Sequence, residues 1–213
     1  MKGFLLAGLL VATLLGTGCQ SVYYSTWEKL GKQKRDLLKT KVEQVRDEQK
    51  DASQQLKDSL TRLQELYGFQ GGELERFYKD LQKDYDRSTA QADNVRNRIR
   101  QMEQIAQDMF REWETEDQSI SSPALREDSR NKLQQTRQRY ADLYAAVTRA
   151  ERSMTPVLTK FHDYVLYLKH NLNAQAIGSL QNEAASIQQA ITQLISDMNA
   201  SISKAEEFIK AVP

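Results

Sequence analysis

The stretch LQQTRQRYADLYAAVTRAERSMTPVLTKFHDYVLYLKHNL, residues 133–172, decides the fold. Its mostly apolar repeating positions are Leu133, Thr136, Tyr140, Leu143, Val147, Ala150, Met154, Val157, Phe161, Val165, Leu168 and Leu172. The positions between them are mainly Arg, Gln, Lys, Asp and Glu. Steps of three and four residues sustained over this length indicate a coiled-coil helix with one packed face and one solvated face.

Three other segments repeat this pattern. Residues 38–66 do so with Gln49 and Ser59 at two core steps, and residues 85–113 do so with Ser88 at one. Residues 177–209 continue the pattern to the end of the chain, where the predicted core steps are Met198, Ile202, Ala205 and Ile209. The sequence therefore predicts four long helices.

The breaks between these helices are short. YGFQGG (residues 67–72) supplies glycines for a reversal, and QSISSPA (residues 118–124) supplies Ser122 as a cap and Pro123 as a first helical residue. HNLNA (residues 170–174) is a weaker break. Helices of about 38–47 residues, roughly 57–70 Å long, joined in this way favour an all-α, elongated antiparallel four-helix bundle. The alternative is a single rod formed by the third and fourth helices.

The first eighteen residues, MKGFLLAGLLVATLLGTG, have the charged start, apolar run and small residues of a secretory signal. Cys19, the only cysteine, follows LLGTG, which resembles the lipobox of bacterial lipoproteins. That resemblance implies cleavage before Cys19 and acylation of its thiol and new amine; the alternative is ordinary secretory cleavage. Gln20, where an aspartate would signal inner-membrane retention, favours the outer membrane. The expected parts are a signal peptide (1–18), a lipidated tether (19–26) and a helical domain (27–213).

Charge argues against a nucleic-acid protein. The signal contains Lys2 as its only charged residue, and its removal leaves equal numbers of basic and acidic residues. A neutral balance with mixed signs lacks the basic surface that nucleic-acid binding requires. It also disfavours purely electrostatic membrane binding.

Three further motifs resemble an uncharacterised family of proteobacterial lipoproteins with a domain of unknown function. They are YYSTWEKLGKQKRDLL after the cysteine, FREWE near the end of the second helix, and VLYLKHNLNAQAIGSL. The resemblance covers nearly the whole mature chain and implies a helical coiled-coil fold with no established activity. Some family members are labelled as a DNA repair ATPase, but no glycine here opens a G-x-x-x-x-G-K-[ST] phosphate loop.

Catalytic and metal-binding patterns are weak. His162 and His170 are two turns apart, and neither has a glutamate three residues before it or lies in an H-E-x-x-H motif. His162 and Asp163 are neighbours and point to different sides of a helix. We therefore expect no metal, no cofactor and no enzymatic activity.

Two groups of residues are candidate contact sites. Lys169, His170, Asn171 and Asn173 suit a helix end, since cations and Asn favour that position. Alternatively, they form a recognition tip with Phe69, together with Tyr164 and Tyr167. Near the lipid, we expect the aromatic residues Tyr23, Tyr24 and Trp27 at headgroup level; the alternative for Trp27 is a cap on the bundle core.

The expected function is a non-enzymatic, lipid-anchored scaffold or partner-binding protein on the periplasmic side of the outer membrane. Its expected partners are the membrane, through the lipid, and an envelope protein; a homo-oligomer is possible. The alternative is a helical protein that lies on the bilayer and remodels or senses it.

Overall fold

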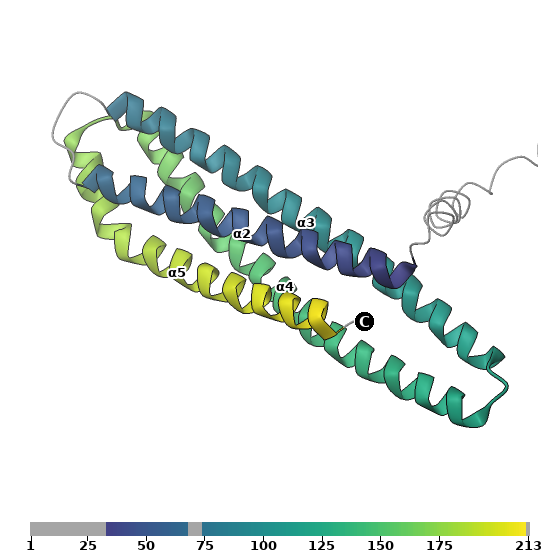
Figure 1. Ribbon diagram of the computed structural model, residues 1–213. Helices are drawn as coiled ribbons and strands as arrows, with labels where there is room; N and C mark the ends of the chain where they lie inside the picture. The colour runs from purple at the N-terminus through teal and green to yellow at the C-terminus, as the bar shows by residue number, and fades with distance from the viewer. Residues whose placement is uncertain (1–32, 68–73, 212–213) are drawn as a thin grey trace, which may run out of the picture.

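The computed structural model describes residues 33–67 and 74–211. These residues form four long helices and, within the described ranges, no strand (Figure 1). The helices are α2 (Lys34–Tyr67), α3 (Leu74–Ser119), α4 (Pro123–His170) and α5 (Ala174–Ala211). They pack antiparallel in one elongated bundle, so the predicted fold class is confirmed.

Each helix packs against two neighbours. α2 and α4 both contact α3 and α5, and they occupy opposite corners of the bundle. α4 and α5 lie side by side as a hairpin, which makes the single-rod alternative wrong. The α4–α5 loop and the facing ends of α2 and α3 therefore lie together, at what we call the loop end of the bundle (Figure 1).

The predicted heptad steps form most of the core. In α2, even the polar residues Gln49 and Ser59 are fully buried at the predicted steps. In α5 the predicted steps hold to Met198 and again at Ala205, but the steps predicted at Ile202 and Ile209 fall one residue earlier. The buried residues there are Ser201, Ala205 and Phe208, whereas Ile202 and Ile209 are only half-buried.

Two contacts explain the shift in α5. The Ser201 hydroxyl donates a hydrogen bond to Oε1 of Gln49, 2.6 Å away in the core. Phe208 packs edge-on against Tyr140, with ring centroids 6.1 Å apart. A buried amide requires a polar partner, so the core at this level is completed by Ser201 and not by the neighbouring isoleucine.

Pro156 lies inside α4, which nevertheless runs as one helix from Pro123 to His170. Proline costs a helix one backbone hydrogen bond. Its exposed position between buried Met154 and Val157 keeps the ring out of the core. Packing on both sides of the proline therefore maintains the helix.

The hairpin of α3 and α4 extends past the other two helices. Lys34, the first residue of α2, pairs with Glu112 (Nζ to Oε1, 2.5 Å). The carbonyl of Ala211, the last residue of α5, accepts a hydrogen bond from Arg139 (3.5 Å). Residues 113–138, which we call the projection, therefore continue beyond both described ends (Figure 1). At the rise of an α-helix, the α4 part is about 24 Å long.

Candidate functional site

The polar residues of the loop end mainly close and open helices. Asn171 donates from its backbone N to the carbonyl of Leu168 (3.2 Å) and from Nδ2 to the carbonyl of Tyr167 (2.9 Å). Asn173 accepts from the backbone N of Ala176 at 2.9 Å. These bonds match the helix-end interpretation of both asparagines. Lys169 and His170 are exposed in the last turn of α4, and Phe69 lies outside the described residues.

Apolar residues are also exposed at the loop end. Leu166, Tyr167 and Leu172 are 44%, 37% and 41% exposed, and among the described residues only one other large hydrophobic residue, Leu125, is exposed to this extent. The expectation that Tyr164 joins this surface is wrong, because its ring is buried in the core. Within one turn of α4, Tyr164 thus points into the core and Tyr167 points to the solvent.

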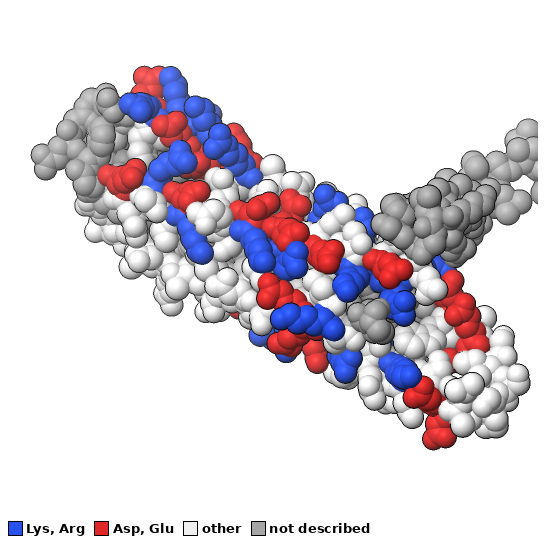
Figure 2. All heavy atoms as spheres, in the orientation of Figure 1, with Lys and Arg blue, Asp and Glu red and all other residues white. Residues whose placement is uncertain are grey.

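A long uncharged surface runs from the loop end along α5. Residues 174–196 contain a single charged residue, Glu183, whereas α2 carries fifteen in Lys34–Tyr67. Figure 2 shows this surface as the largely white lower-left edge of the bundle, beside the blue and red side chains of the neighbouring helices. We define the neutral face by its exposed residues Gln175, Ser179, Asn182, Ala185, Gln189, Gln193 and Ser196.

The neutral face has a signal in the sequence, but the composition of the whole chain hides it. The chain has 28% charged residues, and only the count for a single helix reveals the gap. The core pattern of α5 gave no further indication, because Gln, Ser and Asn on an outer face are ordinary solvated residues.

The two histidines do not belong to a cluster of metal ligands. His162 is exposed and packs its ring against Tyr85 of α3, with centroids 5.4 Å apart. His170 lies two turns further along α4, at the loop end. Across residues 33–67 and 74–211, no group of three or more His, Cys, Asp or Glu side chains converges on a metal-sized site.

A buried acid lies between α2 and α3. The Asp84 side chain is fully buried, and its Oδ2 is 3.0 Å from Nε of Arg62, which is half in solvent. Burial raises the pKa of Asp84, and the charges of Arg62 and Arg87 only partly oppose that rise. Asp84 thus belongs to an ion pair between two helices.

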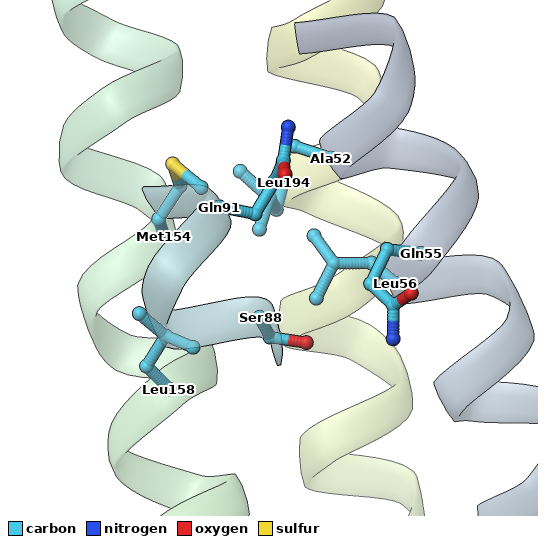
Figure 3. Close-up of a pocket in the computed structure, with 8 residues that line it drawn as sticks. All are labelled: Ala52, Gln55, Leu56, Ser88, Gln91, Met154, Leu158 and Leu194. Carbon is cyan, nitrogen blue, oxygen red and sulfur yellow. The ribbon is translucent and has the colours of Figure 1, made fainter. Parts of the chain in front are cut away.

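A small internal cavity lies near the middle of the four-helix core. Its volume of about 10 Å³ is close to the minimum for one water molecule and far below the size of a substrate. The Ser88 hydroxyl lines it and has no protein hydrogen-bond partner. Figure 3 shows the lining residues Ala52, Gln55, Leu56, Ser88, Gln91, Met154, Leu158 and Leu194. This cavity fits a single buried water.

The projection is held together by side-chain hydrogen bonds. The indole N–H of Trp113 donates to Ser129 (2.8 Å), whose hydroxyl donates to the buried carboxylate of Asp117. At the turn, Arg126 donates from Nε and Nη2 to the carbonyl of Ile120 at 2.9 and 2.5 Å. The sequence alone does not reveal this network, because it depends on the relative register of α3 and α4.

The start of α4 lies where the sequence predicted it. Ser122 caps the helix by accepting from the backbone N of Leu125 (3.5 Å), and Pro123 is the first helical residue. Cap and proline together fix where the chain turns back, as this pair of residues usually does.

The residues predicted to lie near the membrane are outside the part of the chain that the structure describes. Cys19, Tyr23, Tyr24 and Trp27 lie outside the described residues. Within those ranges, none of the helices has an apolar run sufficient to cross a bilayer.

A protein-family model matches most of the chain. Residues 23–212 match the model of a family described as a protein of unknown function, DUF2959. Searches of curated proteins and of solved structures gave no match. The matched range spans all four helices, so the chain belongs to the DUF2959 family.

Proposed function

We propose that the protein is a non-enzymatic lipoprotein of the outer membrane. In this proposal it faces the periplasm and binds an envelope protein through the neutral face of α5. The lipid on Cys19 holds it to the membrane, as the lipobox-like LLGTG-Cys19 sequence implies. The bundle then acts as a spacer that carries the binding surface.

The neutral face is the observation that carries the proposal. The cores of protein interfaces are depleted in charged residues, because a charge buried at a contact loses its hydration. Gln, Asn and Ser side chains can donate and accept hydrogen bonds, so they can pair with a polar partner surface without an unpaired charge. Exposed Leu166, Tyr167 and Leu172 add apolar area near one end of this face.

The position of the face fits a spacer. The chain enters the described bundle at Lys34, at the opposite end of α2 from the loop end. The thirty-four residues of α2 correspond to about 51 Å at the helical rise. A lipid tether before Lys34 would thus hold the beginning of the neutral face well away from the bilayer.

Photo-crosslinking in the producing cells tests this function. Crosslinkers at Asn182 and Gln189 should yield a discrete protein adduct, whereas crosslinkers at the exposed control positions Lys57 and Lys83 should not. Adding Gln189→Lys should abolish the adduct at Asn182, since it places a charge in the contact. The same adducts at all four positions, or none, would contradict the proposal. Lipid adducts at Asn182 and Gln189 would instead favour the alternative of a protein that lies on the membrane.

A further inference from the structure

We infer that the tip of the projection, residues 118–125, contacts the bilayer surface. It is then a second membrane contact, in addition to the acyl chains on Cys19. This inference rests on the proposed anchoring through Cys19. It concerns a different part of the molecule from the neutral face, and it assigns a role to the extra length of α3 and α4.

The geometry brings the tip and Lys34, the first residue of α2, to the same end of the bundle. Lys34 lies beside Glu112, and α3 runs seven residues further, or about 10 Å at the helical rise, before the turn. Gln33 is fourteen positions after Cys19, so the chain between them spans at most about 50 Å when extended. When the long axis of the bundle points at the bilayer, the tip is the foremost described part of the chain (Figure 1).

The tip is chemically suited to a lipid interface. Residues 118–125, QSISSPAL, carry no charge. Leu125 is 63% exposed, the most exposed large hydrophobic residue among the described ones, and the neighbouring Pro123 and Ala124 are exposed as well. Figure 2 shows a white surface at this end of the molecule, with acidic side chains set behind it. Apolar groups gain by leaving water, so a nearby bilayer offers Leu125 the contact that the bundle does not.

The tip is also held in a fixed shape. The two bonds from Arg126 to the carbonyl of Ile120 lock the turn, and the Ser122 cap fixes the first turn of α4. Leu125 lies in that first turn and is held outward. A preformed tip loses little conformational entropy on contact.

Charge favours a neutral lipid surface over an acidic one. The projection holds four basic residues, Arg126, Arg130, Lys132 and Arg137, and five acidic residues, Glu114, Glu116, Asp117, Glu127 and Asp128. This near balance gives no strong attraction to anionic lipid, so the contact is apolar and should be insensitive to salt. Glu127 and Asp128 directly follow the tip and limit how deeply it can enter the bilayer. Only residues 118–125 can enter, because a carboxylate that followed them would lose its hydration.

Spin-label depth measurements test the contact on the full-length lipidated protein in zwitterionic phosphatidylcholine vesicles. Because Cys19 is the only native cysteine and acylation blocks its thiol, Leu125→Cys provides a unique labelling site. Leu166→Cys, also exposed but at the loop end, is the matched control. The label at residue 125 should show a several-fold loss of collisions with a water-soluble nickel chelate relative to residue 166, at low and high salt.

Co-sedimentation with the vesicles separates the possible failures. If both labelled proteins sediment with the vesicles but their labels are equally accessible to the nickel chelate, the tip contact is overturned while the lipid anchor stands. If neither protein sediments, the anchor itself is overturned, and this inference falls with it.

Discussion

The four-helix section and the projection share the helices α3 and α4 but are stabilised differently. In the four-helix section, apolar residues from α2, α3, α4 and α5 fill a shared core. In residues 113–138, all of which the structure describes, Leu133 is the only buried apolar residue. Hydrogen bonds between Trp113, Ser129 and Asp117 replace the missing core. A helical hairpin can thus leave its bundle if side-chain bonds substitute for the two absent helices.

The largest effect is expected from Phe161→Ala in the four-helix section. Phe161 is fully buried, so its loss leaves a cavity and should cost about 3–5 kcal/mol of unfolding free energy. Urea denaturation measures this cost, and Phe161→Leu should lose clearly less. A loss of well under about 1 kcal/mol would mean that the four-helix section is not held by tight packing.

A smaller and local effect is expected from Asp117→Ala in the projection. It leaves the Ser129 hydroxyl without its acceptor and should cost about 1–3 kcal/mol. Hydrogen exchange should accelerate in residues 113–138 and remain unchanged in residues 38–63 of α2. Asp117→Asn, which keeps an acceptor oxygen, is the matched control. Equal acceleration in α2 would remove the distinction between the two regions.

Asp84 is a buried carboxyl in the four-helix section, and the pH dependence of stability tests the effect of its burial. Its pKa is raised in the folded protein by burial. The native state therefore binds a proton more readily than the unfolded state, and this contribution to stability is lost as pH rises from the ordinary aspartate value through the raised one. Asp84→Asn removes that titration, so urea midpoints of the variant should fall less than those of the wild type across this range. If the urea midpoints of the variant and the wild type changed equally with pH, burial would not be what sets the pKa of this carboxyl.

The smallest effect is expected at Gly178 in the second turn of α5. A Cβ built there meets nothing within 4 Å, so no internal packing requires glycine. Gly178→Ala should raise the stability by about 0.5–1 kcal/mol through helix propensity alone. Thermal unfolding measures the gain, and an equal effect of Ser179→Ala would show that it does not arise from the glycine. A loss of stability would indicate a contact at this position that the fold does not explain.

The comparison of the two regions also shows how far sequence reasoning reaches. The core of the four-helix section was predictable, because a repeated step of three and four residues requires only that one face be buried; even Gln49 and Ser59 lie where the pattern puts them. The core at the end of α5 was not predictable in this way, because Ser201 is buried there to hydrogen-bond the amide of Gln49 on another helix. A pattern within one helix carries no information on such a partner.

In the projection and the candidate surfaces, too, local features were predictable and contacts between helices were not. Ser122 and Pro123 were predictable as a local cap. The Trp113–Ser129–Asp117 bonds were not, since they depend on how two helices align. Asn171 and Asn173 lie at helix ends as their types favour, whereas Tyr164 and Tyr167 could not be sorted into buried and exposed without the position of α5.

The central proposal is that the acyl chains on Cys19 anchor the protein to the membrane, and that the contact of the projection tip is too small to retain it without them. Fractionation of cells expressing Cys19→Ala tests it most directly, with the wild type as control and cleavage of the signal checked by mass. We expect the cleaved variant to move to the soluble envelope fraction while the wild type stays with the membranes. A cleaved variant that remains on the membranes after carbonate and high-salt washes would contradict it.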